Sequence, residues 1–493
     1  MRSNHLLAAT ILAAGLAAGA LAPPALAQKP AKPPTKAEVA ANKKAHDEAR
    51  QGENEFKALY KELIETNTTL SVGSCTKAAE QIKARLTAAG YPEGDLHLIL
   101  PPERKQDGNL IAVLPGSDPK QKALLLLAHI DVVEANRADW VRDPFKLTEE
   151  GGFYYARGSS DDKSMAAIFA DSMIRFKKSG YKPKRAVKLA LTCGEESPNN
   201  FDGASYLVEH QKPLLDAAFA LNEGAGGRLE PKTGSYVFNG VQAGEKVYQD
   251  YTLEVTNPGG HSSRPMPNNA IYHLSAALLK VQGMDFPVEF NDATRGYFAR
   301  MGALQGGPVG ADMVAASKDD PAAIARLKKD PSANSILHTN CVATQLLGGH
   351  APNALPQRAT ANVNCRIFPG HAQEEIRKAI EIAVNDPEVK VTLRDPPEKV
   401  SPPPPLTPEI LGPIEALSEA MFPGVPVIPT MAAGATDGRF LTPAGIPTYG
   451  VSGIFADPDT VNAHGLNERV KVTSLLEGRE FLYRLAKLYA GGK

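Results

Sequence analysis

The sequence predicts an α/β fold in two parts, a mostly parallel sheet covered by helices and a smaller α/β sandwich inserted into it. Two observations lead to this prediction. In the first half of the chain, short apolar runs alternate with helical patterns, which is typical of strands buried on both faces of a parallel sheet. After about Gly244 the expected order is strand, helix, two strands, helix and strand, the split βαβ arrangement of a ferredoxin-like sandwich.

The elements of the larger part follow from the spacing of its apolar residues. Helical periodicity predicts amphipathic helices, and short continuous apolar runs predict buried strands. Gly90 and Gly180 stand where two of these helices are expected to end. The predicted helices are 38–65, 75–89, 164–178 and 204–210, and the predicted strands are 96–100, 110–114, 123–129, 186–192 and 217–221.

The inserted part begins with alternating apolar and polar residues, which predict a half-exposed strand. Its predicted elements are the strands 247–257, 336–347, 359–367 and 389–393 and the helices 270–281 and 372–384. Residues 284–335 are rich in turn and charged residues, and we expect them to extend this part. Helix and strand patterns resume after the proline run 402–405. We therefore expect a larger domain of 37–244 and 402–493, interrupted by an inserted domain of 245–401.

Composition restricts the class of protein. The chain has 493 residues, 43% of them hydrophobic and 22% charged, so it is long enough for more than one globular domain and too apolar to be disordered throughout. Its 54 Lys and Arg residues balance 55 Asp and Glu residues, which leaves no basic surplus to neutralise phosphates. We therefore expect no nucleic-acid partner.

The N-terminus has the pattern of a cleaved secretory signal in residues 1–27. Arg2 is its single charge, an apolar run follows, and Ala25-Leu26-Ala27 supplies the small residues of a cleavage site. A membrane anchor is the alternative, but the apolar run is short, contains glycine and has no basic stop after it. We expect an exported protein, periplasmic or secreted, with no stable membrane insertion after cleavage and a flexible tether at 28–36.

Export makes the four cysteines candidates for disulfides. Cys341 and Cys365 flank a glycine-rich turn at nearly equal distances, so they either face each other as a disulfide or form a pair of small buried residues. Cys193 is expected to be a buried free thiol, and Cys75 has no evident partner.

The first candidate site residues follow the strand 123–129. Because residues two apart point to the same face, His129 and Asp131 converge at the end of this strand, where parallel sheets usually hold ligands. A lone His-x-Asp pair is more often structural than metal-binding. Three further acidic clusters favour a metal-binding role for this pair.

These clusters stand near the ends of other predicted strands and ahead of a helix. They are Asp161-Asp162, Glu195-Glu196 and the single Glu223. The aspartates alone could cap the helix that follows them, and a rim of salt bridges could explain one such acid. Several buried carboxylates are costly unless they are paired or bind metal. With His464 in a late polar loop, they suit a two-metal hydrolytic site for zinc, or for cobalt or manganese.

These residues carry a resemblance to one family in five ordered motifs. The motifs are His129-Ile130-Asp131, Arg157-Gly158-x-x-Asp161-Asp162-Lys163, Gly194-Glu195-Glu196, Gly259-Gly260-His261-Ser262 and His464-Gly465-x-Asn467-Glu468. From about residue 50 onward the chain resembles the co-catalytic metallopeptidases that include glutamate carboxypeptidase, aminoacylase, carnosinase and succinyl-diaminopimelate desuccinylase. The stretch 129–145, with Trp140 and Asp143-Pro144-Phe145, is most similar to the carnosinase and carboxypeptidase S branch.

The resemblance implies two zinc ions per chain. Asp161 would bridge them, His129 and Glu223 would complete one ion's ligands, and Glu196 and His464 the other's. Asp131 would fix the tautomer of His129. Glu195 would be the general base. In relatives the peptide between the two aspartates is cis.

The resemblance also assigns a role to the inserted domain as a lid and dimerisation domain. His261 would reach the partner's active site and stabilise the oxyanion, although a histidine after two glycines is by itself more often a turn residue. Asn353 and Arg366 would bind substrate, and the fork of Arg366 suits a carboxylate. A surface salt bridge is the alternative for Arg366. The loop Gly434–Arg439 would have a structural or substrate-positioning role.

The sequence therefore predicts an exported zinc hydrolase that cleaves the amide bond of dipeptides, peptide C-termini or N-acyl amino acids, as a homodimer. Two departures from the family pattern, Glu134 and Ser164, are not ligands and bear only on the substrate subclass. A non-catalytic peptide-binding protein on the same fold is the alternative, but this chain keeps Glu195 and every expected ligand. A serine hydrolase is disfavoured because the chain has no Gly-x-Ser-x-Gly motif.

Overall fold

The computed structural model describes residues 52–197 and 201–492. The expected signal, the tether and the first part of the helix predicted at 38–65 lie outside these residues. Within the described ranges, no helix combines the length and the apolar composition needed to cross a membrane.

Ten strands of the described chain form the central sheet, in the order β1-β2-β6-β3-β7-β17-β9-β8-β18, with β16 paired to β9. β3 runs parallel to β6 and β7, and β7 runs parallel to β17, whereas β1 and β2 form an antiparallel edge. The mostly parallel sheet predicted from the sequence is confirmed. The bounds are β1 Leu96–Ile99, β2 Asn109–Leu114, β3 Leu124–His129, β6 Val187–Thr192, β7 Phe219–Asn222, β8 Gly227–Leu229, β9 Tyr236–Glu245, β16 Val427–Ala432, β17 Thr448–Gly450 and β18 Phe455–Ala456.

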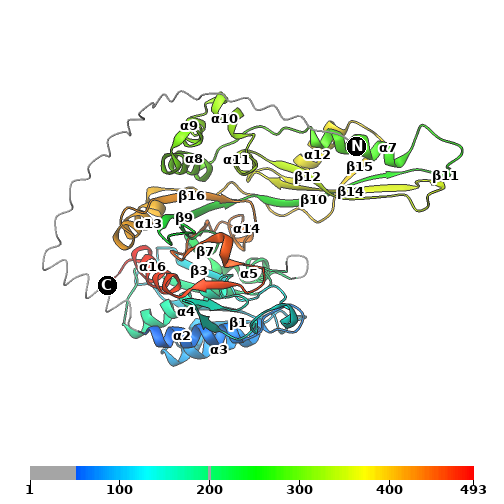
Figure 1. Ribbon diagram of the computed structural model, residues 1–493. Helices are drawn as coiled ribbons and strands as arrows, with labels where there is room; N and C mark the ends of the chain where they lie inside the picture. Colours follow the sequence, from blue (N-terminus) through cyan, green and yellow to red (C-terminus); the bar gives the residue numbers. More distant parts are fainter. Residues whose placement is uncertain (1–51, 198–200, 493) are drawn as a thin grey trace, which may run out of the picture. The chain divides into compact units, whose positions relative to one another are not determined.

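Both faces of this sheet are covered, which explains the continuous apolar runs of its inner strands. Every residue of β3 is buried, and alternate leucines enter different cores: Leu124 and Leu126 one, Leu125 and Leu127 the other. The first core includes side chains of α2 (Glu53–Glu65), α3 (Cys75–Ala88), α4 (Lys163–Lys178), α13 (Pro408–Met421) and α16 (Val472–Ala490). The second includes α5 (Gly203–His210), α6 (Lys212–Leu215) and α14 (Gly438–Leu441). Helix α16 lies beside α4 and β3 although the sequence places it last (Figure 1).

The inserted sandwich has the predicted split βαβ order. Its antiparallel sheet runs β12-β14-β10-β15, and α7 and α12 pack on it. On β14, Ala361, Val363 and Cys365 enter the core with these helices, whereas the residues between them are polar. The bounds are β10 Val247–Thr256, α7 Ala270–Gln282, β12 Asn340–Gly348, β14 Arg358–Ile367, α12 Gln373–Val384 and β15 Lys390–Leu393.

Residues 284–335 are largely helical, and the strand predicted at 336–347 begins later than expected. The helices are α8 Asp292–Gln305, α9 Gly307–Ala316, α10 Pro321–Leu327 and α11 Pro331–Leu337. Asp320 and Asp330 cap α10 and α11, and each is followed by a proline at the first helical position. Helix α11 extends to Leu337, so β12 starts only at Asn340.

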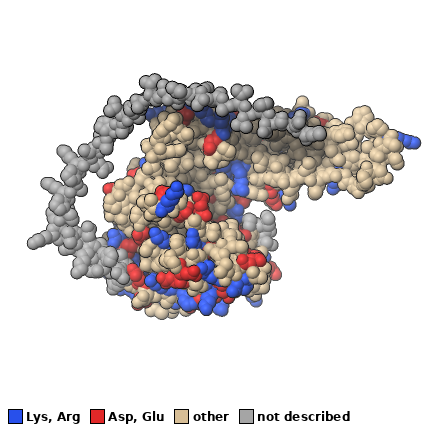
Figure 2. Space-filling model, viewed as in Figure 1, with Lys and Arg blue, Asp and Glu red and all other residues tan. Residues whose placement is uncertain are grey.

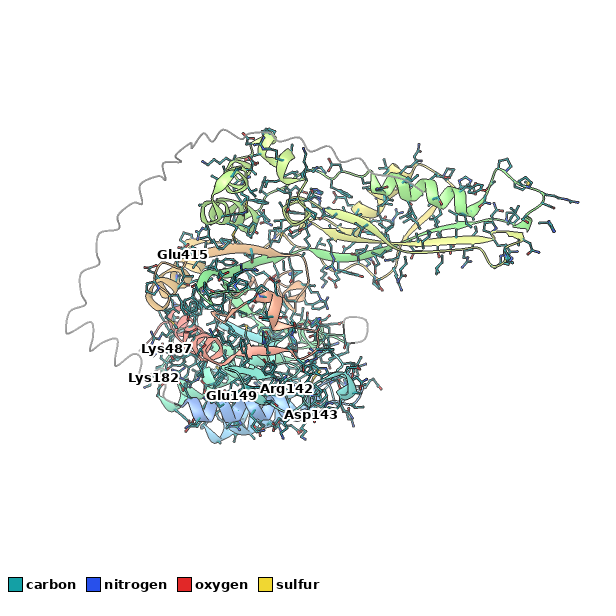
Figure 3. The ribbon with its side chains drawn as sticks, in the orientation of Figure 1. Arg142, Asp143, Glu149, Lys182, Glu415 and Lys487 are labelled. Carbon is teal, nitrogen blue, oxygen red and sulfur yellow. A yellow bond between two sulfur atoms is a disulfide. The ribbon has the colours of Figure 1, made fainter. Side chains whose placement is uncertain are left out.

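Helix α8 connects this helical segment to the central sheet by packing against β16. Its Arg300 donates to the carbonyl of Val427 in β16 and pairs with Glu415 of α13, which Figure 3 labels. Charged residues of both signs are interspersed over the visible face of the larger part (Figure 2).

All four cysteines are paired, which corrects one expectation. Cys193 is not a free thiol, because it forms a disulfide with Cys75. The two residues are 118 positions apart, and the fold joins them because α3 packs on β2 and β2 pairs with β6, which ends next to Cys193. Cys341 and Cys365 also form a disulfide, at directly opposed positions of β12 and β14.

Candidate metal centre

The candidate residues come from the carboxyl ends of three neighbouring parallel strands. His129 ends β3, Glu195 and Glu196 follow β6, and Glu223 follows β7. Because these strands run in one direction, their ends meet at one edge of the sheet, as the sequence analysis expected. Asp161 reaches the same place from the loop before α4.

Asp161 lies between the two histidines and presents one oxygen to each. Its Oδ1 is 3.1 Å from His129 Nε2, and its Oδ2 is 3.0 Å from His464 Nε2. Glu223 Oε1 lies 3.8 Å from His129 Nε2, and Glu196 Oε2 lies 3.0 Å from His464 Nε2. Asp161 therefore lies between two pairs, each made of one histidine and one further carboxylate.

Ligand atoms of these residues gather in groups small enough to surround an ion. Three groups have all their ligand atoms within 4.8 Å of one another: His129, Asp161 and Glu223; Asp161, Glu196 and His464; and His129, Glu195 and Glu196. Asp161 belongs to the first two groups. The donors are nitrogen and carboxylate oxygen without sulfur, a set that suits zinc, cobalt or manganese.

Asp131 supports the site from behind His129. Its carbonyl oxygen lies 3.1 Å and its carboxylate Oδ1 lies 3.5 Å from His129 Nδ1, which leaves Nε2 directed at Asp161. Its Oδ2 accepts a hydrogen bond of 3.0 Å from the backbone nitrogen of Glu196. Asp131 therefore orients the ring of His129 and also holds the backbone of Glu196.

The electrostatics of the cluster favour binding of a cation. Burial raises the pKa of Glu223 well above its ordinary value, because little water reaches the carboxylate. Hydrogen bonds to Asp161 and Glu196 raise the pKa of His464 to about 10. A divalent cation among these carboxylates would neutralise the buried negative charge.

Glu195 lies within the third ligand group, next to His129 and Glu196. Burial raises the pKa of Glu195 to about 7. A carboxylate with a raised pKa next to a metal position has the properties required of a general base.

Glu468 is a supporting residue to which sequence reasoning gave no role. Its carboxylate accepts hydrogen bonds from Arg157 Nη1 at 2.7 Å and from the backbone nitrogens of Gly158 (3.0 Å), Ser160 (2.7 Å) and Asp161 (3.0 Å). It thereby fixes the loop that presents Asp161. The motif contained Glu468, but its spacing does not reveal which donors the side chain meets. The peptide that follows this loop, between Asp161 and Asp162, is cis.

The loop Gly434–Arg439 packs on the ends of β6 and β7. Asp437 Oδ2 accepts a hydrogen bond of 2.5 Å from the hydroxyl of Thr192, and Thr436 Oγ1 accepts one of 3.1 Å from Asn222 Nδ2. The loop therefore supports the strands that present Glu195 and Glu223.

The predicted residues of the inserted domain lie outside the ligand groups of the described chain. His261 in β11 (Gly260–His261) pairs with Ala354 of β13 (Ala354–Leu355), and Asn353 next to it accepts a hydrogen bond of 3.1 Å from Ser262 N, so His261 and Asn353 lie side by side. Both are exposed.

Arg366 lies near the end of β14 and contacts the loop region that follows β16. It donates a hydrogen bond of 2.8 Å to the carbonyl of Ala433, and its guanidinium lies 4.6 Å from the ring centre of Tyr248. Within the described residues Arg366 has no carboxylate partner, so the alternative of a surface salt bridge is not realised there.

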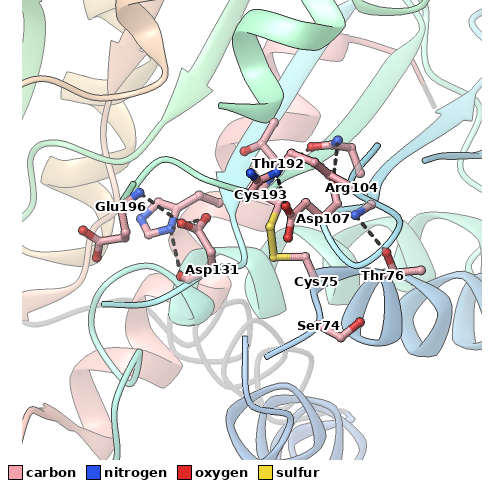
Figure 4. The surroundings of a disulfide bond; sticks show 12 residues. Ser74, Cys75, Thr76, Arg104, Asp107, Asp131, Thr192, Cys193 and Glu196 are labelled. Atoms are coloured by element: carbon pink, nitrogen blue, oxygen red, sulfur yellow. Dashed lines mark hydrogen bonds and ion pairs between the residues drawn. A yellow bond between two sulfur atoms is a disulfide. The ribbon is translucent and has the colours of Figure 1, made fainter. Parts of the chain in front are cut away.

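The disulfide Cys75–Cys193 anchors the segment that carries two of the acids. Figure 4 shows it beside Asp131 and Glu196, with Cys193 directly after Thr192 of β6. The backbone nitrogen of Cys193 also donates to the Asn109 side chain at 3.0 Å. The start of α3 and the strand β2 therefore hold the segment just before Glu195.

A mostly parallel α/β sheet with histidine and carboxylate groups at its carboxyl edge is the arrangement of a metal-dependent hydrolase. Residues 125–488 match the model of peptidase family M20/M25/M40, and the chain belongs to this family. The family identified from the sequence motifs is confirmed, and with it the assignment as a hydrolase.

The names of related proteins agree with the assignment as a hydrolase. The chain is 29% identical over 365 residues to N-fatty-acyl-amino acid synthase/hydrolase PM20D1 of Xenopus tropicalis, covering 72% of this chain and 70% of the relative. An M20 metallo-carboxypeptidase of Sulfolobus solfataricus has a TM-score of 0.64 at 19% identity, covering 88% of this chain and 99% of that one. Human carnosine dipeptidase 1 has a TM-score of 0.59 at 14% identity, covering 91% and 98%. These structures share the fold.

Proposed function

We propose that the protein is an exported metal-dependent hydrolase that cleaves the amide bond of N-acyl amino acids, dipeptides or peptide C-termini. The observation that carries the proposal is the position of Asp161, with one oxygen toward His129 and the other toward His464. The family supplies the class of reaction, and the names of relatives include both an N-acyl amino acid hydrolase and a carboxypeptidase.

In this proposal His129, Asp161 and Glu223 would hold one metal ion, and Asp161, Glu196 and His464 would hold the second. Two divalent ions, zinc in the first instance, would supply Lewis-acid activation of the amide carbonyl and of water. Asp131 holds His129 in the tautomer whose Nε2 is free to bind.

Glu195 moves the proton. Its carboxylate accepts the proton of the attacking water and returns it to the leaving nitrogen. Arg366 binds the free carboxylate of the substrate, exchanging its present bond to the Ala433 carbonyl for a charged partner. Asn353 lies beside His261 on the ribbon β11–β13 and binds substrate from that ribbon.

The experiment is a panel of dipeptides and N-acyl amino acids assayed with zinc-loaded protein. Glu195→Gln should bind metal normally and lower kcat by about a thousandfold, because the shape is kept and the base is lost. Glu134→Gln is the matched control, since that carboxylate accepts from Ser71 outside the ligand groups. Wild-type turnover in Glu195→Gln would rule out the assigned base.

Dimerisation through the inserted domain is part of the proposal. The strand β12 is an edge of its sheet, and it exposes Val342, Leu346 and Leu347. Tyr272 and Leu279 of α7, the helix that packs against β12, are exposed as well. On the face visible in Figure 2 the sandwich carries few charges. A second copy is the partner that suits an uncharged edge strand of this kind.

Mixed dimers test the role of His261 in the partner's site. His261→Ala and Glu195→Gln chains are inactive alone, but a mixed dimer contains one site with both groups intact. Equal mixing after dissociation should restore about a quarter of wild-type activity, since half of the dimers are mixed and each has one good site. No recovery from proven mixed dimers would place His261 outside the partner's site.

Export is supported by the two disulfides, which form and persist in oxidising compartments. The mature N-terminus should be Gln28, after the signal 1–27. N-terminal sequencing of protein recovered from the periplasm or medium tests this, and an uncleaved chain retained in the cytoplasm would contradict it.

A further inference from the structure

A groove opens beside the candidate metal centre, and its lining includes no residue of the inserted domain. It has a volume of about 540 Å³, within the range of sites that hold a small organic ligand. Two of the proposed metal ligands, Asp161 and Glu223, line one end, so the groove is continuous with the place where the amide bond would be cleaved.

The residues that line the groove are of two kinds. The polar ones other than Arg228 and Ser452 belong to the segments that carry metal ligands: Ser160, Asp161, Asp162, Ser164, Glu223 and Asn462. The rest of the wall is largely apolar or small: Met165, Gly224, Ala225, Gly226, Gly227, Phe238, Ile454, Ala456, Pro458, Val461 and Ala463. A ligand held there would have its polar group at the metal end and an apolar group along the wall.

The floor of the apolar end is a row of side chains across three strands. Ala456 of β18 is paired with Arg228 of β8, and Arg228 is paired with Phe238 of β9. Directly paired residues project to the same face of a sheet, which agrees with the presence of all three in the groove lining. Ala456 is the small member of this row, so the space above it is kept open. The alkyl stem of Arg228 offers further apolar surface.

One wall of the groove consists of the segment directly after Glu223. Gly224, Ala225, Gly226 and Gly227 carry almost no side chain, so the wall is the backbone itself. At Gly226 a Cβ would lie 2.8 Å from Ser452 Oγ and 2.9 Å from the Ile454 carbonyl, so the adjacent segment that leads into β18 leaves no room for a side chain there. The groove therefore has a small-residue wall that starts at a metal ligand.

We propose that this groove, which we call the acyl groove, binds the apolar acyl chain of an N-acyl amino acid. The inference rests on the proposed function, because that function places the scissile amide at the metal end. An acetyl group would leave most of the volume empty, whereas a medium or long alkyl chain would bury apolar surface along Ala456 and Phe238. The amino acid then lies on the opposite side, toward Arg366.

The test is a series of N-acylglycines with acetyl, octanoyl and dodecanoyl groups, assayed with the zinc-loaded mature chain below micelle concentrations. Glycine keeps the amino-acid side constant. Wild-type kcat/KM should rise by about tenfold or more from acetyl to dodecanoyl, because each buried methylene adds to binding. Ala456→Trp should lower the dodecanoyl-to-acetyl ratio by about fivefold or more by filling the floor. Leu488→Trp, on the exposed surface of α16, is the matched control and should keep the wild-type ratio.

A second variant and a binding measurement keep the outcome decisive. Phe238→Asn should lower the same ratio without adding bulk, and circular dichroism with metal content identifies any variant that fails to fold. A wild-type ratio near one, or a ratio that survives both substitutions in folded protein, overturns the proposal.

Calorimetric titration of the zinc-loaded protein with dodecanoate and with acetate separates this inference from the proposed function. If no N-acylglycine is hydrolysed, the proposed substrate class fails, and the groove is then judged by binding alone. Dodecanoate should bind more tightly than acetate to the wild type and lose this advantage in Ala456→Trp. Equal binding of dodecanoate to both proteins would overturn the acyl groove.

Discussion

The carboxylate of Glu468 offers a sharp perturbation of the site that leaves every proposed ligand in place. One of its oxygens accepts from Arg157 Nη1 and Gly158 N, and the other accepts from Ser160 N and Asp161 N. In Glu468→Gln one oxygen is replaced by an amide NH2 group, which donates and can accept from neither of the donors it faces. Two buried donors therefore lose their partner, whichever way the amide turns.

The magnitude follows from these contacts. Each buried donor left without an acceptor costs about 1–3 kcal/mol. Arg157, whose side chain is only 3% exposed, also loses its counter-charge, and breaking a buried ion pair typically costs about 3–5 kcal/mol. We expect Glu468→Gln to lower the free energy of unfolding by about 3–5 kcal/mol. Because the same loop presents Asp161, metal affinity should fall by about 10–100-fold.

Urea unfolding followed by circular dichroism measures the first effect, and zinc titration against a competing chelator measures the second. Glu134→Gln is again the control, since Glu134 accepts from Ser71 outside the metal centre, and it should change the free energy of unfolding by less than about 1 kcal/mol. If Glu468→Gln matches the wild type in both stability and metal affinity, the reasoning from these four hydrogen bonds is refuted.

Three further predictions concern the disulfide, a histidine of the inserted domain and substrate binding. Replacing Cys75 and Cys193 by serine should lower the free energy of unfolding by about 4 kcal/mol, because a loop of 118 residues is released. The same replacement should reduce kcat, and an unchanged kcat would contradict the role of the disulfide in anchoring the segment before Glu195. Hydrogen bonding to Glu289 raises the pKa of His371, so its stabilising contribution is complete below about pH 6.5 and is lost as the pH rises through the raised pKa. The difference in the free energy of unfolding between the wild type and His371→Gln, below about 1 kcal/mol, should therefore shrink as the pH rises above about 6.5, and a difference that grows would contradict this prediction. Arg366→Ala should raise KM by about tenfold or more with little change in kcat, and an unchanged KM would remove its role in carboxylate binding.

The site was largely predictable because its residues stand at strand ends. Strand 123–129 was expected to present His129, and the structure places it there beside Asp161 and Glu223. Parallel strands bring their carboxyl ends to one edge of the sheet regardless of the conformation of the loops. The local sequence pattern and the sheet topology together are therefore sufficient to predict that these residues lie close together. The motifs supplied the remaining partner, His464, which is distant in the sequence.

Other features depend on contacts that sequence patterns do not encode. Cys75 and Cys193 lie together because α3 packs on β2 and β2 pairs with β6. The sequence around the two cysteines does not indicate either of these contacts. The donors to Glu468 are mainly backbone nitrogens, which any sequence offers. The helices α10 and α11 are not evident from the turn-rich composition of residues 284–335, although Asp320 and Asp330 stand before prolines as N-caps do.

We propose Asp161 as the shared ligand of two metal ions, and counting bound metal tests this role most directly. Wild-type protein saturated with zinc and freed of excess by dialysis should contain about two ions per chain by elemental analysis, and Asp161→Asn should retain fewer than about one. Glu134→Gln, prepared in parallel, should keep the wild-type content. A wild-type chain that binds one ion or none at saturation, or an Asp161→Asn chain that still binds two, would contradict the central claim.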